Sequence, residues 1–313
     1  MARIKHANRS ENEVYLSPRE LADALGVSES SLKRWADGGR LEVERTVGGH
    51  RRIPLGEAVR FVRVTGLRPV RPELLGLGEI GAGPTETEGD ERTPAQERFH
   101  AALREDRGEE ARSLLVSLYL DGAGLGWICD AVIRSALARV GELWRENEAG
   151  VFLEHRATET CARALGEIRR LLPPLSPEAA VALGGASAGD VYRLPSAMAA
   201  LVLAEAGFRD RDLGADTPVQ ATAAAIRHYR PGLVWQSFSV PPGDPRDARL
   251  GLGRLARAWP SATLVVGGRA ADSVPLQRHP GVVRLGSMAE LAAFARGLVR
   301  PEPTPDSRSR ARS

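Results

Sequence analysis

Residues 189–195 read GDVYRLP and place a carboxylate, Asp190, two positions before a phenol, Tyr192. An apolar run precedes this stretch at residues 180–183, and a helical pattern follows it at residues 196–206. In α/β sheets, ligands bind where a strand ends and the next helix begins. The stretch is therefore a candidate ligand site, and Asp190 and Tyr192 are the side chains that could hold a ligand there.

A second group of candidate residues is basic and lies near the N-terminus. Ser17-Pro18-Arg19-Glu20 is a capping box with proline at the first helical position, Gly26 ends that helix, and Ser28 caps another. Two short helices joined by a tight glycine turn form a helix-turn-helix. Gly48-Gly49 then suits the tip of a β-hairpin, a wing, with basic residues on both sides.

The stretch that contains these elements, LSPRELADALGVSESSLKRWADGGRLEVERTVGGHRRI, closely resembles the MerR family of winged helix-turn-helix regulators. Between Arg45 and Arg63 five arginines accompany one acid, Glu57, which predicts a local positive patch. Outward positions of the second helix suit base edges, and wing arginines suit phosphates. The predicted DNA-binding residues are Ser31, Lys33, Arg34, Arg45, His50, Arg51 and Arg52. The alternative is an arginine-rich surface that binds another protein.

Further along the chain, three motifs follow one another at defined spacings. After residues 189–195 come 41 residues and then Ser237-Phe238-Ser239; a further 27 residues lead to Gly267-Gly268. These spacings resemble the cobalamin-binding Rossmann-like domain, whose motifs are Asp-x-His-x-x-Gly, Ser-x-Leu and Gly-Gly. The resemblance implies cofactor-binding roles for Asp190, Tyr192, Ser237, Ser239, Gly267 and Gly268.

The first of these motifs departs from the family at two positions. The family's histidine ligates cobalt and its glycine leaves room for the corrin, but this chain has Tyr192 and Pro195 there. A phenol is mostly protonated near pH 7 and is a poor metal ligand. Histidine-on ligation of cobalt through residue 192 is therefore excluded, and adenosylcobalamin is implied only by the family.

The middle of the chain contains LWRENEAGVFLEHRATE. Its order of residues resembles the four-helix cap of cobalamin-dependent MerR-type light sensors, the CarH type. The resemblance implies that Trp144, Val151, Glu154 and His155 line the cap. The family's histidine after the tryptophan is Arg145 here. Taken alone, His155 is more often a core or surface histidine than a ligand contact.

Composition limits the class of protein. A hydrophobic content of 42% and a charged content of 27% predict a soluble globular protein. With no signal segment and no apolar run of spanning length, we expect a cytoplasmic protein without a membrane partner. Cys129 and Cys161 lie in helical, apolar contexts and are predicted to pack as small hydrophobic residues, with no metal site.

These observations predict a multidomain α and α/β chain. We expect a winged helix-turn-helix at residues 10–67, a flexible linker at 68–93, a four-helix cap at 94–173, a cobalamin-binding-like, flavodoxin-like parallel sheet at 176–300, and a disordered tail at 301–313. We predict a transcriptional regulator that is not an enzyme and that binds a double-stranded DNA operator as a homo-oligomer. A small-molecule effector would control its assembly and so its affinity for DNA. The alternatives are a cobalamin-binding regulator with other cobalt ligation, a corrinoid carrier for an enzyme, and a protein-interaction module.

Overall fold

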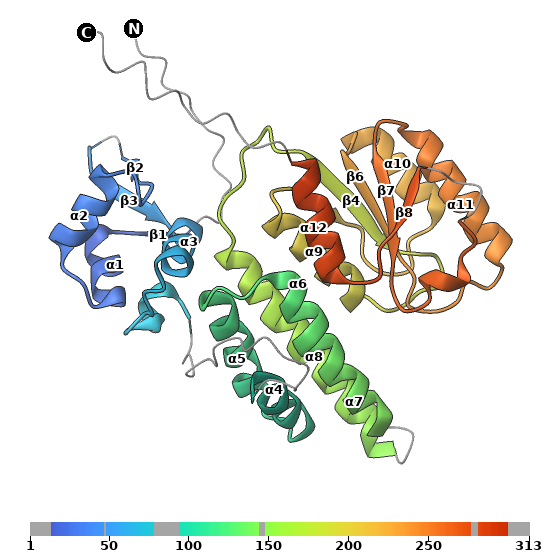
Figure 1. Ribbon diagram of the computed structural model, residues 1–313, viewed down its shortest axis with the longest axis horizontal. Coiled ribbons are helices and arrows are strands. Elements are labelled where there is room, and N and C mark those ends of the chain that lie inside the picture. Colours follow the sequence, from blue (N-terminus) through green and yellow to red (C-terminus); the bar gives the residue numbers. More distant parts are fainter. Residues whose placement is uncertain (1–13, 47, 78–93, 144–147, 277–280, 300–313) are drawn as a thin grey trace, which may run out of the picture.

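The computed structural model describes residues 14–46, 48–77, 94–143, 148–276 and 281–299, which form three parts (Figure 1). We call them the reader (residues 14–77), the helical module (94–172) and the sheet module (181–299). The helical module lies between the other two in the view of Figure 1. One continuous hydrophobic core runs through all three, from Leu21 in the reader through Leu115 to Ala295 near the C-terminus.

The reader begins with strand β1 (Tyr15–Leu16) and helices α1 (Pro18–Leu25) and α2 (Glu29–Asp37). The predicted capping box is confirmed, because the Ser17 hydroxyl accepts from the Glu20 N–H at 3.2 Å and the Glu20 carboxylate accepts from the Ser17 N–H at 2.7 Å. Gly26 ends α1 with a φ of 65°, a left-handed conformation that favours glycine.

The predicted wing is also present. Strands β2 (Glu44–Arg45) and β3 (Arg51–Pro54) pair antiparallel, and β1 adds to the other edge of β3. Helix α3 (Leu55–Thr65) follows β3 directly and buries Phe61 against the reader core. The first residues of the expected linker are structured: the 3₁₀ helix η1 (Pro72–Leu75) packs beside α1, with Leu75 and Leu77 buried. The rest of that expected linker lies outside the described residues.

The helical module consists of α4 (Pro94–Arg104), α5 (Gly108–Leu120), α6 (Leu125–Trp127), a π-helix η2 (Ile128–Arg134), α7 (Ser135–Leu143) and α8 (Glu148–Leu171). Cys129 and Cys161 are free and fully buried in this module, so the predicted packing role is confirmed. Among the described residues no helix is long and apolar enough to cross a membrane.

The sheet module is a doubly wound parallel sheet with the order β5-β4-β6-β7-β8, which confirms the predicted flavodoxin-like class. Its strands are β4 (Val181–Ala186), β5 (Arg209–Asp212), β6 (Leu233–Ser237), β7 (Thr263–Gly267) and β8 (Val282–Arg284). Helices α9 (Leu194–Glu205) and α12 (Met288–Leu298) cover the face nearer the helical module. Helices α10 (Val219–Tyr229) and α11 (Pro245–Ala258) cover the other face, and a short 3₁₀ helix η3 (Ala271–Ser273) follows β7.

The strand order reverses between β4 and β6, so the fold places a ligand-type crevice at the carboxyl ends of these two strands. The GDVYRLP stretch follows β4 and leads into α9, and Ser237 ends β6. The chain topology therefore brings together the motif residues that the sequence separates by 41 positions.

Candidate DNA-binding surface and ligand-type loop

Helix α2 presents the predicted base-reading residues. Lys33 and Arg34 are exposed, whereas Leu32 is buried and Trp35 packs against Phe61 with ring centroids 5.1 Å apart. Ser31 is half-buried, and its hydroxyl lies 3.0 Å from the hydroxyl of the helix cap Ser28. Lys33 and Arg34 are thus free to face a groove, while Ser31 also supports the start of the helix.

A hollow of about 630 Å³ lies between α2 and the wing. Lys33 lines it from the helix, and Arg45, Gly49 and Arg51 line it from the hairpin. His50 and Arg52 are exposed beside it. The lining also includes one acid, Glu29, and apolar residues, but its three cations outnumber that acid, so the surface can accept a phosphate backbone.

The predicted positive patch is smaller than the count of arginines suggests. Arg51 forms an ion pair of 2.5 Å with Asp37 at the end of α2, Arg60 is paired with Glu57, and Arg63 points into the helical module. Within the described residues, Arg45 and Arg52 are the two of the five that form no ion pair. Sequence counting fails here because it registers charges and not their partners.

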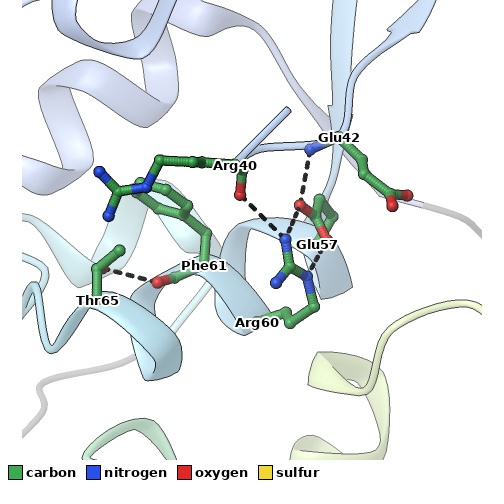
Figure 2. A network of polar contacts seen from close by, with 6 residues as sticks. All are labelled: Arg40, Glu42, Glu57, Arg60, Phe61 and Thr65. Atoms are coloured by element: carbon green, nitrogen blue, oxygen red, sulfur yellow. Dashed lines mark hydrogen bonds and ion pairs between the residues drawn. The ribbon is translucent and has the colours of Figure 1, made fainter. Parts of the chain in front are cut away.

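Glu57 organises the segment between α2 and the wing (Figure 2). Its carboxylate is buried and accepts three hydrogen bonds: from the Glu42 N–H at 2.8 Å and from Arg60 Nε and Nη2 at 2.5 and 2.6 Å. Arg60 also donates to the Arg40 carbonyl at 3.2 Å. The hydrogen bond to Glu57 raises the pKa of Arg60 above its ordinary value. Glu57 and Arg60 of α3 thus fix the backbone at Arg40 and Glu42, in the segment that joins α2 to the wing.

The residues expected to line a cap lie at the start of α8, except Trp144, which is outside the described residues. Val151 and its neighbour Phe152 are exposed by 43% and 57%. Glu154 is half-buried and His155 is exposed, and neither side chain forms a hydrogen bond to another described residue. Val151, Glu154 and His155 thus share one side of α8 that is at least partly accessible to solvent.

The loop after β4 is held by Asp190, which is fully buried. Its carboxylate accepts from the Tyr192 N–H at 3.1 Å and from the Ser239 N–H at 2.5 Å, and its own carbonyl accepts from the Asp216 N–H at 2.8 Å. Asp190 therefore locks the loop to two other strand ends. Both of its carboxylate oxygens are engaged by backbone without any side chain at position 192.

Tyr192 itself is exposed by 42%, and the Arg269 guanidinium lies 5.1 Å from the centre of its ring. Arg269 also donates to the Ser239 carbonyl at 2.6 Å. The arginine thus connects the loop after β7 to the loops after β4 and β6. Sequence reasoning missed Arg269 because it belongs to none of the three motifs.

The other two motifs have different surroundings. The hydroxyls of Ser237 and Ser239 are buried and have no hydrogen-bond partner in the described part of the chain. A side chain at Gly268 would place its Cβ 2.4 Å from the Phe238 carbonyl oxygen, and one at Gly267 would come within 3.2 Å of the Leu285 carbonyl oxygen. Internal packing therefore accounts for Gly268 without a ligand, whereas the two serine hydroxyls retain unused hydrogen-bonding capacity.

The interior of the sheet beside this loop is filled. The Trp235 ring packs on Gly184, where a Cβ would come within 2.4 Å of the ring. The indole N–H donates to the Ser196 hydroxyl at 3.0 Å, and Ser196 donates to Asp212 at 2.7 Å. Within the described loop at residues 189–195, position 192 thus offers a phenol in place of an imidazole, and Asp190 is already hydrogen-bonded to the backbone. These residues do not fit a histidine-ligated cobalamin.

The comparisons with known proteins agree with this arrangement of modules. Residues 15–61 match the family model of a helix-turn-helix domain, and residues 95–169 match that of a B12 binding domain. The chain is 28% identical over 265 residues to the HTH-type transcriptional repressor CarA of Myxococcus xanthus. The aligned region covers 81% of this chain and 86% of that protein.

Among solved structures, the chain is similar to the monomethylamine corrinoid protein of Methanosarcina barkeri. The TM-score is 0.51 and the identity 16%, over 66% of this chain and 98% of that protein. At this identity the similarity shows the fold alone. The chain therefore joins a helix-turn-helix domain to a B12-binding-type helical module and a Rossmann-like sheet, and over most of its length its sequence is similar to a transcriptional repressor.

Proposed function

We propose that this chain is a sequence-specific DNA-binding transcriptional regulator whose helical and sheet modules control its assembly, without histidine ligation of cobalamin. The observation that supports this most is the exposed face of α2 beside the cationic wing, on a reader that shares its core with a B12-binding-type module. Linking two weak readers raises affinity through effective concentration, so an effector need only change assembly.

In this proposal the basic residues have separate roles. Arg45 and Arg52 bind phosphates, Lys33 and Arg34 contact base edges, and Arg51 holds the wing to α2 through Asp37. Phosphate contacts release counterions and make affinity depend on salt, whereas base contacts determine sequence preference. Ser31 and His50 are expected at the margin of the interface.

The test is DNA binding as a function of salt, with a duplex that the protein itself selects from a random pool. Replacing both Arg45 and Arg52 by Ala is expected to reduce the slope of log affinity against log salt by about 1.8, since each phosphate contact contributes about 0.9. Arg254→Ala, an exposed arginine on α11, is the matched control and should leave the slope unchanged. An unaltered slope in the double variant would exclude the wing as a phosphate-binding element.

A second candidate is a regulator that binds cobalamin without a protein histidine. The match to the B12 binding domain and the unpartnered hydroxyls of Ser237 and Ser239 favour it. An absorbance spectrum of the protein with added adenosylcobalamin in the dark distinguishes the two: a protein-bound cobalamin spectrum after gel filtration supports this candidate, and its absence supports the first.

A further inference from the structure

The reader is docked on the rest of the chain through α3. Near the start of α3, Gly56 lies so close to the end of α8 that a Cβ would come within 2.4 Å of the Leu172 carbonyl oxygen and 2.6 Å of the Pro173 Cα. Only a glycine permits this approach of backbone to backbone. Because α2 and the wing lie on other sides of the reader, docking leaves the proposed DNA-binding surface accessible (Figure 1).

Near the other end of α3, Arg63 contacts both other modules. Its guanidinium lies 3.8 Å from the centre of the Tyr119 ring and donates to the carbonyls of Tyr119 and, at 3.2 Å, Ala123 in the helical module. Its second nitrogen lies 3.3 Å from the carboxylate of Glu205, the last residue of α9 in the sheet module. Burial raises the pKa of Tyr119 to about 12, so its ring stays neutral under the cation.

Glu205 completes the connection. While one carboxylate oxygen faces Arg63, the other accepts from the Leu125 N–H at 3.0 Å, at the start of α6. The side chains of Arg63 and Glu205 are only 18% and 17% exposed. Partial burial protects this pair from the solvent screening that makes exposed pairs weak.

Helix α9 connects this contact to the ligand-type loop. Residues 189–195 lead into its N-terminus, Ser196 is anchored there to Asp212 and Trp235, and Glu205 lies at its C-terminus. The helix is buried along nearly its whole length, and its 12 residues span about 18 Å. Helix α9 is therefore the direct chain connection between the ligand-type loop and Glu205.

We propose that Arg63, Tyr119 and Glu205 form a clamp that fixes the orientation of the reader, and that α9 transmits changes at residues 189–195 to this clamp. The regulatory meaning of the clamp rests on the proposed function, but the clamp itself does not depend on DNA binding. Hydrogen bonds near 3.0–3.3 Å are lost when one partner moves by about 1 Å, so a small shift of α9 removes both Glu205 contacts and weakens the clamp.

The test measures the distance between the reader and the sheet module directly, without DNA or effector. Spin labels on Asp23→Cys in α1 and Asp247→Cys in α11 report it by pulsed electron resonance, and the native cysteines are buried and stay unlabelled. The parent protein should give one narrow distance distribution. Arg63→Gln and Glu205→Gln should each increase the undocked fraction by about tenfold, as expected for a lost charged hydrogen bond.

Two further variants complete the design. Arg68→Gln breaks the more exposed Arg68–Asp121 pair at the same interface and should leave the distribution narrow. Ser196→Ala, at the far end of α9, should broaden it. An unchanged distribution in both Arg63→Gln and Glu205→Gln overturns the clamp, and broadening in these two but not in Ser196→Ala overturns transmission through α9. Because the measurement contains no DNA, it tests the clamp even if the chain proves not to bind DNA.

Discussion

Replacing Glu57 by Ala should loosen the reader more than any exposed substitution near it. The variant removes one buried carboxylate that accepts from the Glu42 N–H and twice from Arg60. Breaking a buried ion pair costs about 3–5 kcal/mol when the remaining charge stays buried. The Arg60 side chain, however, is 38% exposed and can turn to water, which lowers that cost.

Glu42 is itself exposed, so water can reach its N–H, and the loss of its hydrogen bond to the charged carboxylate costs about 1.5–3 kcal/mol net. We therefore expect Glu57→Ala to destabilise the reader by about 2–3 kcal/mol, which corresponds to a rise in local opening of about 30- to 150-fold. Domains are stable by only about 5–15 kcal/mol, so this loss is large.

Hydrogen exchange followed by mass spectrometry suits this prediction, because it resolves α3 peptides from the other modules. Exchange of the α3 amides should accelerate in Glu57→Ala. Glu73→Ala is the matched control, because its partner Arg71 and Glu73 itself are both more than half exposed and such pairs contribute little. Equal exchange in the two variants would refute the assignment of Glu57 as the residue that organises the reader.

Three other outcomes follow from the contacts. Burial raises the pKa of Cys161 to about 12 and that of Cys129 well above its ordinary value. Both thiols should therefore resist a thiol reagent until urea unfolds the helical module. Rapid labelling of the folded protein would contradict the packing described. Hydrogen bonds from the Ser17 N–H and hydroxyl lower the pKa of Glu20 in the folded state, so its contribution to stability is present above the unfolded value of about 4.5 and is lost as pH falls through the folded pKa. Between about pH 6 and pH 3 the melting temperature of Glu20→Gln should therefore depend less on pH than that of the parent protein. The double variant Tyr192→His, Pro195→Gly should bind cobalamin more tightly than the wild type in an equilibrium titration. The glycine should lower the free energy of unfolding by about 1 kcal/mol. Equal binding by the two proteins would mean that position 192 does not limit the site.

Local signals allowed the sequence to predict much of the fold. The Ser17–Glu20 capping box, the Gly48-Gly49 hairpin and the alternation of strands with helices each depend on neighbouring residues, and the structure has all three. The buried cysteines follow from their apolar helical context in the same way.

Long-range pairing could not be predicted from such signals. Arg63 meets Glu205 across 142 positions, and Asp130 accepts from the Met288 N–H at the start of α12 across 158 positions. Periodicity indicates which face of a helix is buried, but not which element covers it. For this reason an arginine that looked like part of a DNA-binding patch proved to be a contact between modules.

The same distinction explains why the loop after β4 is held in place with a tyrosine at position 192. In this structure the two carboxylate oxygens of Asp190 accept from the backbone N–H groups of Tyr192 and Ser239. A fully buried carboxylate with these partners stabilises the loop whatever the side chain at position 192. The aspartate thus has a structural role that does not depend on a ligand, and its presence alone is not an argument for bound cobalt. The discriminating residues are those without an internal role: Tyr192, half exposed under Arg269, and the buried hydroxyls of Ser237 and Ser239.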